Sequence, residues 1–183
     1  MDGLKLNNII KCYYNAPNMS IANKDLDAFI KCCFYVGKGT NDRKLQHAIL
    51  GKKIFTKQLP FGKISAKFSK IAQLWENGHG ITVLQLFNES THYEAHAREF
   101  AVIKAIGLNN ITNVVSGTMY GAMKIWNHTE IVNFGRMILY NALIMCIYET
   151  PRIIMQDDII LPHPRATLKD WELEGILQCF LDL

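Results

Sequence analysis

The sequence contains no CxxC pair. Its five cysteines are Cys12, Cys32, Cys33, Cys146 and Cys179. Two of them are neighbours in the chain, and an odd number of cysteines cannot all pair within one molecule. Proteins of oxidising compartments usually hold their cysteines in disulfides. The cysteine content therefore predicts a reducing compartment.

Long apolar stretches are absent as well. The N-terminus has no basic region followed by a long apolar run, so no secretory signal is expected. The most apolar window, residues 137–148, contains Asn141 and is shorter than the roughly 20 residues that span a bilayer. We expect a soluble intracellular protein, nuclear or cytoplasmic, that is not secreted and has no membrane partner. The motif GxxxxGKS/T is missing too, which predicts no nucleotide cofactor.

Acidic residues are scarce in one segment. Residues 38–70 hold nine basic residues and one acidic residue, Asp42, for a net charge of +8. The rest of the chain holds 11 basic and 15 acidic residues, for a net charge of −4. Surface helices usually alternate the sign of their charges, and this segment does not. The positive charge predicts a polyanionic partner, and the alternative is a solvated basic face.

The apolar content is high enough to form a core. The 183 residues are 49% hydrophobic, which fits one domain or one domain with an appendage. Composition predicts strands over residues 29–36 and 81–87, the second in the centre of a sheet. Helices are expected from a cap at 40–42 to about residue 50, and over residues 63–77, 91–106, 127–149 and 167–180. There is no internal repeat and no low-complexity segment.

Several of these helices carry end signals. Gly51 is expected to end the first, and in the helix over 63–77 the lysines are expected to lie opposite the apolar side. Thr91 and Glu94 match a capping box, and Gly107 stops that helix. The order of elements predicts an α/β (α+β) fold, a small sheet flanked by helices. We expect a core over residues 1–125 and a helical C-terminal extension over residues 126–183.

Residues 34–47 form a candidate anion-binding stretch, with a strand, a Gly-Lys-Gly turn and a helix. Arg43 and His47 are four residues apart and therefore share a helical face. The other groups that can converge on one anion are Tyr35, Gly37, Lys38 and Gly39. The alternative is an ordinary strand, turn and helix with a solvated basic face.

One carboxylate falls on an apolar helix face. Glu99 lies within the stripe formed by Ala95, Val102, Ile103 and Ile106. Burying a carboxylate is costly unless it is paired or binds a metal, so the alternatives are a metal ligand and a partner of a buried Lys or Arg. His92, His96 and Glu99 could share a face for zinc, but their spacing matches neither HExxH nor HxxEH. A lone Glu suits Mg²⁺ better, since that ion keeps several waters.

Four short motifs stand in a familiar order. They are Tyr35-Val36-Gly37, Arg43-x-x-x-His47, Glu99-x-x-Val102-Ile103 and Ile111-Thr112-Asn113. This series, over roughly residues 29–115, resembles the motifs of GIY-YIG endonucleases. Ala97-Arg98-Glu99 and Ile106-Gly107-Leu108 are most similar to the animal branch whose full-length members add ankyrin repeats and a LEM domain, and the resemblance covers the nuclease domain only.

The resemblance implies a three-stranded antiparallel sheet flanked by helices, and hydrolysis of DNA phosphodiesters with one divalent ion, Mg²⁺ or Mn²⁺. By that resemblance Glu99 holds the metal, Arg43 binds the scissile phosphate, and Tyr35 with His47 orients or deprotonates the attacking water. Asn113 supports the site or contacts substrate. The further substrate-binding candidates are Gly37, Lys38, Gly39, Lys63 and Lys67.

One family motif is missing from its usual place. The opening strand normally supplies a second tyrosine, and Tyr14 or its neighbour Tyr13 is the candidate substitute. Three functions therefore remain open. The first is a metal-dependent DNA endonuclease that recognises branched or otherwise structured DNA, or the DNA backbone. The second is a catalytically degenerate nucleic-acid-binding module, and the third is a scaffold that binds partners through the apolar run 138–148.

Overall fold

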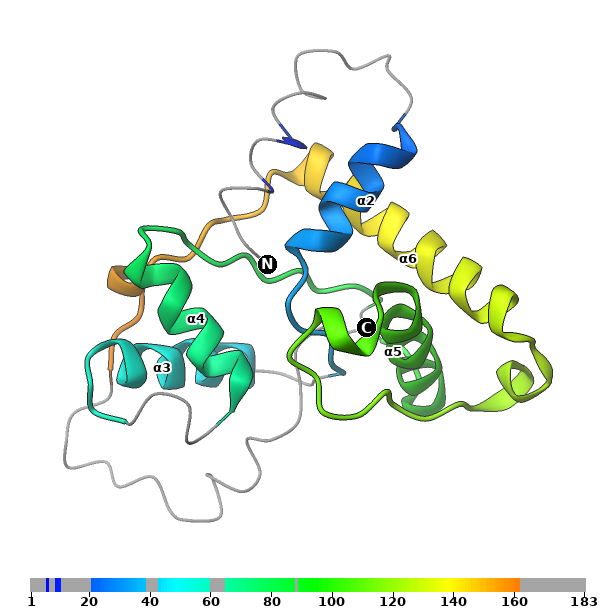
Figure 1. Ribbon diagram of the computed structural model, residues 1–183, viewed down its shortest axis with the longest axis horizontal. Coiled ribbons are helices and arrows are strands. Elements are labelled where there is room, and N and C mark those ends of the chain that lie inside the picture. The colour runs from blue at the N-terminus through cyan, green and yellow to red at the C-terminus, as the bar shows by residue number, and fades with distance from the viewer. Residues whose placement is uncertain are drawn as a thin grey trace.

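The computed structural model describes residues 6, 9–10, 21–38, 43–59, 65–87 and 89–161. Within these ranges the chain is mostly helical (Figure 1). The α-helices are α2 (Asn23–Cys32), α3 (Arg43–Phe55), α4 (Ala66–Glu76), α5 (His92–Ile106) and α6 (His128–Glu149). Three short 3₁₀ helices accompany them: η1 (Leu108–Asn110), η2 (Gly121–Ile125) and η3 (Gln156–Asp158). The expected helix over residues 167–180 lies outside the described residues.

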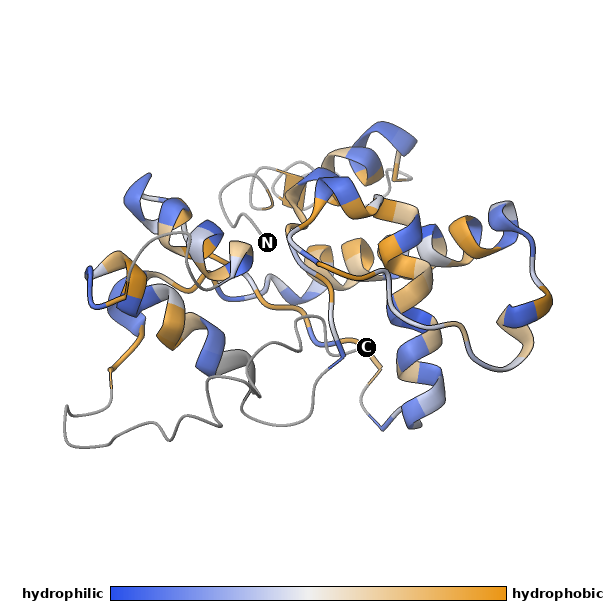
Figure 2. Ribbon diagram, turned by 60° about the horizontal axis from the view of Figure 1, so that its bottom comes forward, coloured by the Kyte–Doolittle hydropathy of each residue, from blue (hydrophilic) through white to orange (hydrophobic). Residues whose placement is uncertain are grey.

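The helices form two groups, each around its own apolar cluster. One group is the pair α3 and α4, and the other consists of α2, α5 and α6 (Figure 1). Two extended segments, 33–38 and 81–87, contribute to both clusters. Phe34 and Ile81 pack with the α3–α4 cluster, whereas Val36, Leu84 and Leu86 belong to the cluster of α2, α5 and α6. Figure 2 shows apolar residues on the helix sides that face these interiors. Each extended segment therefore packs against both groups of helices.

The expected small sheet is wrong for the described residues, which contain no regular strand. An isolated antiparallel bridge joins Ile81 and Ile154, whose backbone amides each donate to the other's carbonyl at 3.0 and 2.7 Å. Residues 29–32, read as part of a strand, belong to α2. Leu26, Phe29 and Cys32 are its buried residues, spaced three apart as in a helix. A short apolar run carries no period of its own, which is why composition misassigned it.

Gly51 does not end α3, contrary to expectation. The helix continues to Phe55, and Gly51 faces α4. A Cβ atom at Gly51 would stand 2.5 Å from Ile71 Cγ2 and 3.3 Å from Trp75 Cζ3. The glycine is therefore needed for the close approach of two helices, because the protein interior is packed without room for an extra methyl group.

The ends of α5 are as expected. The Thr91 hydroxyl accepts from the Glu94 amide at 3.4 Å, and the Glu94 carboxylate accepts from the Thr91 amide at 2.9 Å, which completes the capping box. Gly107 follows the helix with φ +88°. That value lies in the region that favours glycine.

Helix α6 spans the expected 127–149 region and begins with a second capping box, between Asn127 and Glu130. By length and composition it is the one described helix that could cross a membrane, with 39% of its most apolar window buried. One side of its apolar run lies in the core, since Ile138 is 1% exposed and Leu143 is fully buried, whereas Tyr140 is 36% and Tyr148 79% exposed. Gly135 also lies directly against the backbone of Ala101 on α5. This face packs inside the protein, which counts against its use as a partner surface.

Candidate active site

The segment 34–38 is held in place by residues 112–113. The Phe34 carbonyl accepts from the Thr112 amide at 2.7 Å and from the Thr112 hydroxyl at 2.8 Å. The Asn113 side chain binds both backbone groups of Val36, with Oδ1 accepting from the amide at 2.9 Å and Nδ2 donating to the carbonyl at 2.5 Å. The side-chain amide of Asn113 thus makes two backbone hydrogen bonds that a neighbouring strand would otherwise supply. Thr112 at Phe34 and Asn113 at Val36 together fix the backbone on either side of Tyr35.

Tyr35 lies on the side of α3 and α4. Its ring centroid is 6.3 Å from that of His47 on α3, and the His47 ring is 5.3 Å from Phe68 on α4. The Lys67 ammonium stands 4.4 Å from the Tyr35 ring centroid. His47 and Lys67 are each 2% exposed, so both lie in the interior. The structure therefore brings two of the predicted catalytic residues, Tyr35 and His47, into one cluster with a buried cation.

The buried position of Lys67 differs from the solvent position expected for the lysines of this helix. Lys67 falls at helical spacing with Ile64, Ile71 and Leu74, three residues assigned from the sequence to the apolar side. Residue type suggested a solvent position, whereas spacing indicated the interior. The spacing was the signal that could have identified Lys67 as a neighbour of Tyr35.

Glu99 lies on α5, with 14% of its side chain exposed. Its carboxylate accepts a hydrogen bond from the backbone amide of Lys38. Burial raises the pKa of the Glu99 carboxyl above its ordinary value, and the positive charge and amide of Lys38 oppose the rise. Two motifs that are far apart in the sequence therefore meet here. Lys38 follows Gly37, which is buried, and Glu99 comes from the third motif.

Lys38 also contacts His96, one turn before Glu99. The Lys38 ammonium lies against His96 Nε2 and is 3.3 Å from Nδ1. The pKa of His96 is lowered by burial, by Lys38 and by His92. His96 is therefore neutral at pH 7, and its approach to Glu99, 3.8 Å from Nδ1 to Oε2, is not an ion pair. From the sequence, His96 was considered only as a zinc ligand, and its contact with Lys38 was not predicted.

The donor set of this region suits a weakly ligated hard cation better than zinc. Among the described residues no group of three or more His, Cys, Asp or Glu side chains could hold a metal. Zinc in proteins is usually held by three or four such ligands. A single half-buried carboxylate fits Mg²⁺, which retains waters and shares its remaining positions with phosphate. Of the residues described, Glu99 is the one that fits this role.

The remaining predicted residues are only partly placed. Arg43 is the first residue of α3, one turn before His47, and its side chain lies outside the described part of the chain. Gly39, Lys63 and Tyr14 also lie outside it. Their predicted roles remain predictions.

Comparison with known proteins gives a consistent result. The model of the LEM-3-like GIY-YIG domain matches residues 5–161. An ankyrin repeat and LEM domain-containing protein 1 homolog of Caenorhabditis elegans is 31% identical over 140 residues, which are 76% of this chain and 20% of that protein. The mouse ankyrin repeat and LEM domain-containing protein 1 is 31% identical over 134 residues, which are 73% of this chain and 25% of that protein. The human protein of the same name is 31% identical over 136 residues, which are 73% of this chain and 22% of that protein. The chain thus spans a quarter of these relatives or less. No solved structure matches significantly.

Proposed function

The chain belongs to the LEM-3-like GIY-YIG domain family of nucleases, and from this membership we propose that it is a divalent-metal-dependent endonuclease that hydrolyses DNA phosphodiester bonds. One observation carries the proposal. The extended segment 35–38 touches His47 and Lys67 through Tyr35, and Glu99 through Lys38. The segment that carries the first motif thus contacts His47 of the second motif and, through Lys38, Glu99 of the third.

Each candidate residue has a proposed role. Glu99 would hold Mg²⁺ or Mn²⁺, and such an ion would stabilise the charge that develops on the phosphate oxygens. Arg43 would bind the scissile phosphate, because its planar fork matches two phosphate oxygens. His47 or Tyr35 would take the proton of the attacking water. The buried Lys67 ammonium is positioned to stabilise negative charge on Tyr35.

Binding would be directed to the DNA backbone. The lysines of α3, of the turn after it and of α4 include the exposed Lys57 and the half-buried Lys53 and Lys70, in the segment of net charge +8. Phosphate contacts of this kind orient DNA without reading its sequence. We therefore propose that structure, such as a branch, selects the substrate rather than base sequence.

The decisive experiment is a nicking assay on plasmid and branched DNA with Mg²⁺. Wild type is expected to cleave, and Glu99→Ala is expected to lose cleavage while retaining its fold by circular dichroism. Glu76→Ala, at the exposed end of α4, is the matched carboxylate control and should cleave like wild type. Equal cleavage by wild type and Glu99→Ala would overturn the proposed site.

The second candidate is a nucleic-acid-binding module that no longer cleaves. The observation that favours it is the missing first motif, for which Tyr14 and Tyr13 are only candidate substitutes. This function predicts salt-sensitive DNA binding with no cleavage under any divalent ion. Cleavage by wild type that Arg43→Ala abolishes would exclude it.

A further inference from the structure

A cavity of about 290 Å³ opens between α5, η2 and the first turns of α6. Four of its lining side chains are aromatic: Tyr93, Tyr120, Trp126 and Phe134. The rings of Tyr93 and Tyr120 lie 5.3 Å apart, and those of Trp126 and Phe134 meet edge to face at 5.4 Å. Such an aromatic wall offers flat faces to a planar ligand.

The cavity wall can be reached from solvent. Tyr93 lines the cavity and is nevertheless 65% exposed. An exposed aromatic ring at a cavity offers its face to a ligand without a rearrangement of the core.

Side-chain contacts link the cavity to Glu99. The ring of Tyr120, which lines the cavity, is 5.1 Å from the His96 ring. His96 Nδ1 is 3.8 Å from Glu99 Oε2, and His96 also contacts Lys38, whose amide binds Glu99. The side chains of Tyr120 and His96 would therefore stand between a ligand stacked on Tyr120 and the group proposed to hold the metal.

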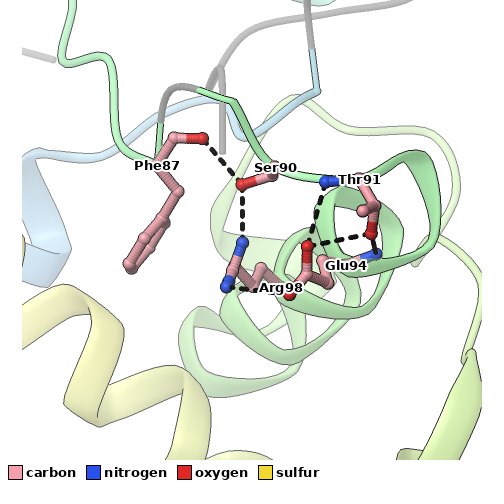
Figure 3. A network of polar contacts seen from close by, with 5 residues as sticks. All are labelled: Phe87, Ser90, Thr91, Glu94 and Arg98. Carbon is pink, nitrogen blue, oxygen red and sulfur yellow. Dashed lines mark hydrogen bonds and ion pairs between the residues drawn. The ribbon is translucent and has the colours of Figure 1, made fainter.

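Two charged groups stand at the rim, and both are already held in place (Figure 3). Arg98 donates to the Ser90 hydroxyl at 2.6 Å, and its guanidinium lies 4.4 Å from the Phe87 ring centroid. The Glu94 carboxylate accepts from Thr91 and approaches Arg98 at 3.7 Å. A carboxylate can accept from an exocyclic amino group, and a guanidinium can donate to a ring nitrogen or carbonyl. Planar aromatic faces with fixed polar groups at the edge suit a nucleobase.

We propose that this cavity binds an unpaired nucleobase of the DNA substrate, stacked on Tyr120 and Tyr93, next to the cleavage site. The proposal rests on the proposed endonuclease function and names the feature of DNA that this part of the protein selects. A base that is already unpaired costs least to move into a pocket, and every base has a face that can stack. Duplexes with a bulged or flapped base are therefore bound more tightly than perfect duplexes.

The test uses the full chain with Ca²⁺ in place of Mg²⁺, so that binding is measured without turnover. The DNA probe is a duplex with one bulged 2-aminopurine, and a duplex with the same base paired serves as reference. Wild type is expected to prefer the bulged duplex and to quench its fluorescence by stacking. Tyr120→Ala should lower affinity for the bulged duplex about tenfold, the scale of one lost base–aromatic stack, and should leave the paired duplex unaffected.

Two further variants make the result decisive. Ala122→Trp fills the cavity from an exposed position and should reproduce the loss, which covers the case in which Tyr120→Ala fails to fold. Tyr148→Ala is the aromatic control, because Tyr148 is 79% exposed on α6 and does not line the cavity. It should bind and quench like wild type.

The outcomes separate the two proposals. If wild type binds and cleaves DNA but neither cavity variant changes the preference for the bulged base, the nucleobase pocket is overturned. If affinity for both duplexes falls equally, the cavity contributes to general binding and the pocket is again overturned. If wild type neither binds nor cleaves any DNA, the endonuclease function itself fails.

Discussion

At the scale of single residues, Lys67 is the position where the structure most changes the expected chemistry. A surface lysine would bind the DNA backbone, and its loss would weaken substrate binding. Lys67 is instead 2% exposed and lies over the Tyr35 ring, where it would act on charge inside the protein. A charge that stabilises the reaction and not the bound substrate is expected to affect turnover.

Lys67→Met keeps the length of the side chain and removes its charge. We expect kcat to fall by roughly 100-fold, as when one electrostatic stabiliser is removed from an active site, with KM little changed. Steady-state cleavage of a short fluorescent duplex measures both constants. Lys24→Met, at an exposed position of α2 and outside the segment of net charge +8, is the matched control. A rise in KM with unchanged kcat would return Lys67 to the role of a phosphate ligand.

The two hydrogen bonds from the Asn113 side chain to the Val36 backbone, called the backbone clamp below, are expected to stabilise the fold. Asn113→Ala leaves the amide and carbonyl of Val36 without their partner, and we expect the free energy of unfolding to fall by about 1–3 kcal/mol. Urea denaturation followed by circular dichroism measures the change. The exposed Asn109 in η1 provides the control, since Asn109→Ala should change stability by less than about 0.5 kcal/mol. Equal effects of the two substitutions would show that the clamp contributes nothing.

At the scale of elements, the end predicted for α3 at Gly51 was wrong, whereas the predicted start and end of α5 were confirmed. Capping residues are read within one turn, so the start of α5 at Thr91 followed from the sequence. The role of Gly51 depends on Ile71 and Trp75 of another helix. A glycine inside a helix cannot be distinguished from one at its end without knowing what faces it.

Gly51→Ala separates the effect of helix propensity from the effect of packing against α4. Helix propensity alone predicts a gain of about 1 kcal/mol from alanine in a helix interior. The new Cβ would stand 2.5 Å from Ile71 Cγ2, and overpacking of this kind costs roughly 1–3 kcal/mol. We therefore expect a lower Tm. Gln46→Ala, on the exposed side of α3, should leave Tm nearly unchanged. A higher Tm for Gly51→Ala would mean that α4 moves away at little cost.

At the scale of the whole molecule, the cluster of α2, α5 and α6 buries two cysteines deeply. Burial raises the pKa of the Cys33 and Cys146 thiols to about 12. The thiolate is the reactive form, so almost none is present at pH 8. Iodoacetamide should therefore leave both residues unmodified in the folded protein and alkylate both in urea, as read by peptide mass spectrometry. Rapid alkylation of Cys146 without denaturant would show that α6 separates from the end of α2 near Cys33. Nuclear or cytoplasmic localisation, expected from the cysteine content, stays a prediction.

The sequence by itself determined the family, the helices with strong end signals and the identity of the candidate site residues. Family motifs such as Tyr35-Val36-Gly37 are contiguous, and capping boxes lie within four residues, so both can be read locally. The tertiary structure decided that residues 29–32 are helical, that Lys67 is buried against Tyr35, and that Lys38 meets Glu99. These facts depend on contacts between residues distant in the chain. The free energy of those contacts depends on both partners, so a pattern within one short segment cannot predict them.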